Sequence, residues 1–110
     1  MTGRIVLSEA AREDRRAITS YTVEHFGIGQ AHRLRANVRR VLETLADNPG
    51  LGRRRPDLDP PGRSFRYFAV MQRFIVVYEP TLAGIRVVRI LHAMRNLAAE
   101  LGRDAGKTRE

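Results

Sequence analysis

Three short apolar runs in the second half of the chain constrain its fold more than any other feature. They span residues 65–70, 74–78 and 85–91 and are rich in Val, Ile, Phe and Tyr. Residues 71–73 and 80–84 form the short connections between them. Short β-branched and aromatic runs separated by short connections predict an antiparallel meander of three strands.

The residues before the meander predict one strand and two amphipathic helices. Residues 5–7 are apolar and β-branched, as in a strand, and Ser8 follows in a position suited to capping a helix. Gly27 suits the end of this first helix, and residues 28–29 a tight link to a second helix at 30–47. The apolar positions of the first helix are Ala11, Ile18, Tyr21, Thr22 and Phe26, and those of the second are Leu34, Val38, Val41, Leu42 and Leu45.

These elements predict one α+β domain, with an N-terminal strand and a two-helix hairpin packed on an antiparallel β-sheet. We expect the domain to span residues 1–101, with a short helix at 97–101, and residues 102–110 to form a flexible polar tail. The 110 residues are 43% hydrophobic and include no cysteine, so the core is predicted to form without disulfides.

The chain is strongly basic, with a formal net charge of +8, and Lys107 is its only lysine. Arginine binds carboxylates and phosphates through two-point contacts, but its pKa above about 12 makes it a poor proton acceptor. No apolar run approaches the roughly 20 residues that span a bilayer, and the N-terminus does not resemble a signal peptide. Together with the absence of cysteine, these features predict a cytoplasmic protein.

Arginines lie throughout the predicted sheet, where Glu79 is the only acid between residues 63 and 96. Three more arginines occupy a loop at 49–62 that is rich in Pro and Gly, and a loop of this length is either functional or mobile. A solvated sheet face normally mixes both signs of charge, so this pattern predicts a binding partner. The candidates for binding a target are Arg53, Arg54, Arg55, Arg66, Arg73 and Arg95.

The predicted meander has apolar side chains on both faces. Phe74, Val76 and Tyr78 alternate with Ile75 and Val77, and in the last strand Val88 and Ile90 oppose Ile85, Val87 and Leu91. One helix hairpin covers one face, so the other is expected to be an exposed apolar surface that binds a partner. Its candidate residues are Ile75, Val77, Arg86, Val88 and Ile90. The alternative is that Leu97 and Leu101 fold back over this face.

The order of elements and four sequence blocks resemble the ParE/RelE toxin superfamily of type II toxin–antitoxin modules. The most specific block is Val-Arg-Ile-Leu-His at 88–92, followed by Arg95 and Asn96. The chain departs from the family pattern at Glu79, Ala93 and Asn96. The other blocks are Ser8, Ala11, Asp14, Ile18 and Tyr21; Asn48, Pro49, Gly52 and Arg53; and residues 66–70.

The two branches of the superfamily imply different chemistry. RelE-like members cleave messenger RNA on the ribosome, which requires a base, an acid and cations around the phosphate. The chain has no lysine before Lys107 for a lysine-based version of this site, but His92 with Arg66 and Arg95 offers an alternative. The structural interpretation of His92 is a hydrogen bond that caps the last strand. His25 and His32 have no companions that would suggest a metal site, and no cofactor is expected.

ParE-like members, by this resemblance, are not enzymes but bind DNA gyrase and block it. A ParD-like antitoxin neutralises them, and its acidic amphipathic segment would suit the predicted apolar surface with its arginine edges. The resemblance therefore favours the toxin of a ParE-type pair that inhibits gyrase and forms a hetero-oligomer with its antitoxin. The alternatives are a RelE-type ribosome-dependent endonuclease and an inactive protein that binds only the antitoxin.

Overall fold

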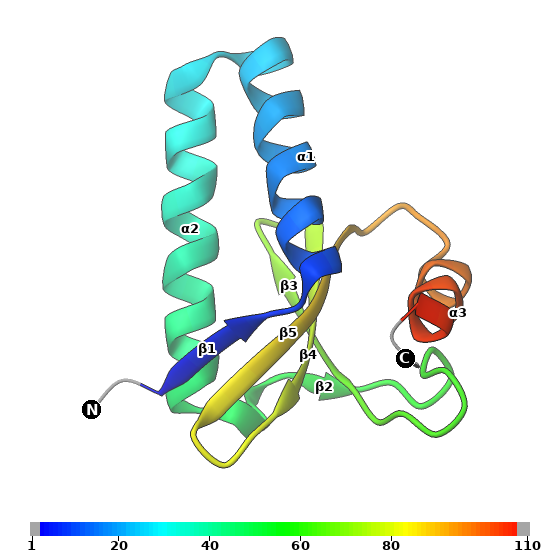
Figure 1. Ribbon diagram of the computed structural model, residues 1–110. Helices are drawn as coiled ribbons and strands as arrows, with labels where there is room; N and C mark the ends of the chain where they lie inside the picture. The colour runs from blue at the N-terminus through cyan, green and yellow to red at the C-terminus, as the bar shows by residue number, and fades with distance from the viewer. Residues whose placement is uncertain (1–2, 108–110) are drawn as a thin grey trace.

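The computed structural model describes residues 3–107, with side chains as far as residue 102, as an α+β fold (Figure 1). A five-stranded sheet has the strand order β1-β5-β4-β3-β2, and no helix in this part of the chain is long and apolar enough to cross a membrane. The elements are β1 (Arg4–Leu7), α1 (Glu9–Phe26), α2 (Ile28–Asp47), the 3-10 helix η1 (Pro49–Leu51), β2 (Arg53–Arg54), β3 (Arg66–Val70), β4 (Phe74–Pro80), β5 (Gly84–His92) and α3 (Leu97–Lys107).

The predicted meander is confirmed, because β3, β4 and β5 pair in antiparallel order. The complete sheet is mixed, however, because β1 joins β5 in parallel, with Ile5 opposite Ile85. The hairpin α1–α2 between β1 and the meander provides the long connection that a parallel strand requires. The short strand β2, predicted as loop, pairs with β3 at the opposite edge.

Local sequence signals set the limits of the helix hairpin. The Ser8 hydroxyl accepts the N–H of Ala11 at 3.0 Å and caps α1 as predicted. Gly27 has φ of 89°, a conformation that favours glycine, and lets the chain reverse in one residue. Helix α2 therefore begins at Ile28, and the predicted two-residue link at 28–29 is wrong.

The inner half of the hairpin packs on one face of the sheet. Leu34, Val38, Leu42 and Leu45 of the predicted α2 stripe are buried. On α1, Ala11 and Thr22 are buried, whereas the side chains of Tyr21 and Phe26 are 58% and 55% exposed. The end of the hairpin extends beyond the sheet (Figure 1), and these two predicted core positions are more than half exposed.

The other face of the sheet is covered by α3, and the prediction that it is exposed is wrong. Leu101 is 1% exposed and packs in a second core with Val77 and Val88. This is the alternative in which Leu97 and Leu101 fold back. Helix α3 continues past Leu101 to Lys107, so residues 102–107 are helical, and the last three residues of the predicted tail lie outside the described residues.

A β-bulge changes the alternation of side chains along β5. Val77 pairs with Arg89 but Tyr78 pairs with Val87, so Val88 is an extra residue in the ladder. As a result Val87 and Ile90 both face the hairpin, while Val88 and Leu91 face α3. The predicted grouping of Val88 with Ile90 is wrong for this reason.

Candidate functional site

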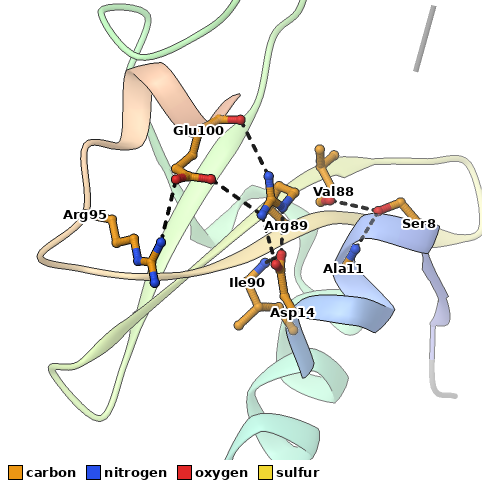
Figure 2. Close-up of polar contacts among 8 residues, drawn as sticks. All are labelled: Ser8, Ala11, Asp14, Val88, Arg89, Ile90, Arg95 and Glu100. Atoms are coloured by element: carbon orange, nitrogen blue, oxygen red, sulfur yellow. Dashed lines mark hydrogen bonds and ion pairs between the residues drawn. The ribbon is translucent and has the colours of Figure 1, made fainter. Parts of the chain in front are cut away.

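An ion pair between Asp14 and Arg89 joins helix α1 to strand β5. Arg89 Nε and Nη2 donate to the two carboxylate oxygens of Asp14 at 2.7 and 2.9 Å (Figure 2). One of those oxygens also accepts the backbone N–H of Ile90 at 3.0 Å. The side chain of Arg89 is 14% exposed and that of Asp14 is 15% exposed. Both residues lie in sequence blocks that resemble the superfamily, but the sequence alone predicts no role for either.

Glu100 connects this pair to α3. Its two carboxylate oxygens lie 3.8 Å from Arg89 Nη2 and 3.8 Å from Arg95 Nη1 (Figure 2). Because the Arg95 side chain is 66% exposed, the contact is a weak ion pair that leaves much of the guanidinium at the surface. Arg95 therefore stays a candidate for contacting a target.

Beside this network, α1 and the end of β5 enclose a groove of about 590 Å³, which we call the His92 groove. Arg73 and Arg95 line it together with His92, and the ion-paired Asp14, Arg89 and Glu100 also belong to the lining. Its apolar wall includes the exposed rings of Tyr21 and Phe26. The structure therefore brings together two of the predicted target-binding arginines and the histidine that the alternative nuclease hypothesis would use.

His92 is exposed at the end of β5, and its ring lies edge-on to Phe74 with a centroid distance of 5.6 Å. Its Nδ1 accepts the N–H of Met94 at 3.2 Å, which agrees with the structural interpretation of a strand cap. The Arg73 carbonyl, on the neighbouring turn, accepts the N–H of Ala93 at 2.9 Å. The turn residues Met71 and Gln72 have φ of 55° and 54°, as in the two-residue turn of a tight hairpin.

Arg66, the third member of the predicted nuclease set, lies at the other end of the sheet. It pairs with Tyr78 in the ladder, whereas His92 pairs with Phe74, four residues along β4. At about 3.3 Å per strand residue this separates the two positions by about 13 Å along the strand. Arg66 Nη1 instead donates to the carbonyls of Gly50 at 3.2 Å and Gly52 at 2.6 Å.

The same end of the sheet carries the basic loop. The buried Tyr78 hydroxyl donates to the Pro49 carbonyl at 2.7 Å and accepts the Gly52 N–H at 2.8 Å, and burial raises the Tyr78 pKa. A Cβ on Gly52 would lie 2.6 Å from that hydroxyl, so the tyrosine and the glycine fit each other closely. Tyr78 and Arg66 thus hold the chain that leads into Arg53.

The three loop arginines differ in their surroundings. Arg53 is exposed and forms no ion pair with a side chain of residues 3–102, while Arg54 lies 3.5 Å from Asp59. Arg55 donates to both oxygens of Asp57 at 3.1 and 2.8 Å, and this contact raises the Arg55 pKa and lowers the Asp57 pKa. The target-binding candidates therefore form two groups at opposite ends of the sheet: Arg53, Arg54, Arg55 and Arg66 at one, and Arg73 and Arg95 at the other.

The five candidates for antitoxin binding do not form one surface. Val77 and Val88 are buried beneath α3, and Ile90 is buried on the opposite, hairpin side. Ile75 is partly buried beside the second core. Arg86 lies 3.3 Å from Glu79, which also contacts Arg63 at 3.3 Å. Direct contact with Val77 or Val88 would require α3 to move.

A family model described as "ParE toxin of type II toxin-antitoxin system, parDE" matches residues 5–97 of the chain. The chain belongs to the ParE toxin family. Toxin ParE1 of Caulobacter vibrioides is 26% identical over 98 residues, which cover 87% of this chain and 95% of that toxin. A solved structure described as the chromosomal ParDE TA system from P. aeruginosa has a similar fold, with a TM-score of 0.65 at 20% identity, covering 82% of this chain and 95% of that one.

The family match includes both ends of the sheet in this ParE toxin. It begins at Ile5 in β1, contains the loop arginines and ends at Leu97, the first residue of α3. The predicted superfamily and fold are therefore confirmed. Most of α3, including the buried Leu101, lies beyond the match.

Proposed function

We propose that this ParE toxin acts in the cytoplasm by binding DNA gyrase and blocking it, and that a ParD-like antitoxin neutralises it. Gyrase as the target is what family membership implies, and the antitoxin is the partner that a ParDE-type module requires. In this proposal the chain is a binding protein and not an enzyme.

The observation that carries the choice between inhibitor and nuclease is the separation of Arg66 from His92. A nuclease needs its base and its phosphate-binding cations around one scissile bond. The sheet register puts Arg66 at one end and His92 and Arg95 at the other. Arg66 also uses its guanidinium to hold two backbone carbonyls.

RNA cleavage at a site that does not include Arg66 is the second candidate function. His92, Arg73 and Arg95 line one groove, so a base and two cations are available there without Arg66. In this case His92 acts through Nε2, because Nδ1 accepts the Met94 N–H. Loss of the histidine would then cost at least about 100-fold in cleavage rate.

A supercoiling assay run beside a translating-ribosome cleavage assay tests the proposal. The variants are Arg73→Ala, Arg95→Ala, Arg53→Ala and His92→Gln, with Arg40→Ala as a matched control on the exposed back of α2. We expect inhibition of supercoiling by wild type, weaker and salt-sensitive inhibition by at least one sheet-arginine variant, and unchanged inhibition by Arg40→Ala.

Messenger-RNA cleavage that disappears in His92→Gln would overturn the proposal. Arg66→Ala belongs in the same series, since the family blocks make Arg66 and Arg95 the first choices for large effects. Its thermal midpoint must be measured alongside, because Arg66 also holds the backbone at Gly50 and Gly52. Equal inhibition by all variants at all salt concentrations would show that these arginines do not contact the target.

A further inference from the structure

Two aromatic side chains at the end of α1 are exposed, although their spacing predicts core positions. Tyr21 and Phe26 are each more than half exposed. Together with His25 they form a cluster of rings, in which the Tyr21 centroid lies 4.2 Å from that of His25 and 6.4 Å from that of Phe26. Helix α1 extends beyond the sheet at this point (Figure 1). Exposed apolar side chains that gather in one place mark a surface that binds a partner.

Two exposed methionines lie in segments at the adjoining end of the sheet. Met71, in the turn between β3 and β4, is 49% exposed, and Met94, after β5, is 86% exposed. The N–H of Ala93 donates to the Arg73 carbonyl at 2.9 Å, which holds these two segments together. The aromatic–arginine surface, as we call it, comprises the exposed residues Tyr21, Phe26, Met71, Arg73, Met94 and Arg95.

The accessible charge of this surface is positive. Arg73 is exposed and forms no ion pair with a side chain of residues 3–102. The Arg95 side chain is 66% exposed and lies 3.8 Å from Glu100. The two acids that line the His92 groove, Asp14 and Glu100, are each 15% exposed and already contact Arg89. A carboxylate of a partner would therefore be attracted to Arg73 and Arg95.

The composition of the aromatic–arginine surface is typical of the central part of a protein–protein interface. Tyr, Phe, Met and Arg are enriched in such interfaces, whereas Lys, Glu and Asp are depleted. A nucleic-acid site would instead need a row of cations that follows the phosphate backbone. Two accessible arginines beside two aromatic rings and two methionines therefore favour a protein partner.

We propose that the aromatic–arginine surface binds the protein target of the toxin, with the rings of Tyr21 and Phe26 inserted into an apolar pocket of that target. Arg73 and Arg95 pair with carboxylates around the pocket. This inference rests on the proposed function, because DNA gyrase is the target meant. The rings lose their contact with water on binding and supply most of the affinity, while the arginines guide the encounter. In this proposal the basic loop at the opposite end of the sheet lies outside the contact.

Inhibition of gyrase supercoiling by single-site variants tests the role of the rings. We expect Tyr21→Ser and Phe26→Ser to require at least about tenfold more toxin for half-inhibition, since aromatic anchors carry much of the binding free energy. Leu82→Ser is the matched control, because Leu82 is also apolar and fully exposed, but in the β4–β5 turn at the opposite end of the sheet. It should inhibit as the wild type does. Thermal midpoints of all three variants should stay close to that of the wild type, because the replaced side chains are mostly exposed.

Two further comparisons separate ring contacts from charge. Phe26→Tyr keeps an aromatic ring and should restore most of the inhibition that Phe26→Ser loses. Arg73→Glu should weaken inhibition at low salt, and the difference from the wild type should shrink as salt screens the charges. Arg40→Glu, on the exposed back of α2, should inhibit as the wild type does.

Photo-cross-linking identifies what the surface contacts. A p-benzoylphenylalanine in place of Phe26 should form an adduct with a gyrase subunit, and the adduct should survive nuclease digestion. The same group in place of Leu82 should form none. Because this replacement keeps a large aromatic side chain, it keeps the inference testable where a serine variant does not fold.

The outcomes separate this inference from the proposed function. Wild-type toxin that does not inhibit supercoiling contradicts gyrase as the target. Inhibition that is equally strong in wild type, Tyr21→Ser and Phe26→Ser, with no adduct at position 26, overturns the inference and leaves the proposed function intact. An adduct at position 26 with DNA alone also overturns it, because the surface would then bind a nucleic-acid strand.

Discussion

Asp14 and Arg89 join α1 to β5 by two parallel hydrogen bonds of 2.7 and 2.9 Å, although 75 residues separate them in the sequence. The Arg89 side chain is 14% exposed and is largely removed from water. Loss of either partner would therefore leave a buried charge without its counter-ion. Arg89 therefore has a structural role, although it lies in the family block that contains the candidate His92.

Replacing Asp14 is expected to destabilise the fold. Asp14→Ala leaves the Arg89 guanidinium largely buried with Glu100 as a more distant partner, and removes the acceptor for the Ile90 N–H. The free energy of unfolding should fall by about 3 kcal/mol. Glu13→Ala, one residue earlier on the exposed face of α1, should change it by about 0.5 kcal/mol or less. Urea titration of both variants measures the difference, and similar losses would contradict a structural role for the pair.

Substitutions on the two faces of α2 should differ in their effect on stability. Leu42 is 5% exposed at the centre of the α2 stripe, so Leu42→Ala should cost about 2–5 kcal/mol. Arg40→Ala, on the exposed back of the same helix, should cost about 0.5 kcal/mol or less. Denaturant titration distinguishes them, and equal losses would mean that α2 presents a different face to the sheet.

Removing the Leu101 side chain should loosen α3 from the sheet. Leu101 is 1% exposed against Val77 and Val88, so Leu101→Ala should lower stability by about 2–4 kcal/mol. Leu82→Ala is the control, because Leu82 is fully exposed in the β4–β5 turn and should change stability little. The midpoint of thermal unfolding reports both, and hydrogen exchange of the Val77 and Val88 amides reports whether α3 has detached. An unchanged midpoint for Leu101→Ala would show that α3 does not stabilise the fold.

The loop pair of Arg55 and Asp57 predicts a pH effect. The hydrogen bond from Arg55 lowers the Asp57 pKa, so the ionised pair favours the folded loop above the ordinary pKa of aspartate. That contribution is lost as the pH falls through the lowered pKa, when the carboxylate becomes protonated. Arg55→Gln should raise the Asp57 pKa towards its ordinary value, as carbon-13 NMR titration of the carboxyl would measure. An identical titration curve in the variant would show that the pair does not form in solution.

Tyr78 should be sensitive to the loss of one oxygen atom. Tyr78→Phe leaves the Pro49 carbonyl and the Gly52 N–H without the hydroxyl that bonds both. We expect a loss of about 1–3 kcal/mol, because buried polar groups would be unsatisfied. Tyr21→Phe is the matched control, since the Tyr21 side chain is 58% exposed. Equal thermal midpoints for Tyr78→Phe and wild type would contradict this role.

Local patterns in the sequence were sufficient to predict most of the elements. The α1 cap at Ser8, its end at Phe26 and the apolar stripe of α2 depend on residues within one or two helical turns, and the structure confirms them. The three meander strands were predicted for the same reason, because their alternation and short turns are local signals. The superfamily was recognisable from blocks of adjacent residues, and the family match confirms it.

The arrangement of the candidate residues could not be predicted in this way. The bulge at Val88 shifts the following residues by one position, and nothing in an alternating apolar run marks it. Arginines that look alike in sequence differ in the fold: Arg66 holds backbone carbonyls, Arg89 pairs with Asp14, and Arg73 and Arg95 line a groove. Their partners are distant in sequence, and charge patterning along the chain does not specify them.

The sequence by itself determined most of the element types, the basic character of the chain and the toxin family, because these follow from local spacing, composition and short motifs. Only the tertiary structure decided that β1 joins the sheet in parallel, that α3 covers the face expected to be open, and that Arg66 lies far from His92. Each of these depends on which segments meet after long loops have closed. The free energy that selects those contacts is shared among many residues and is not visible in a single segment.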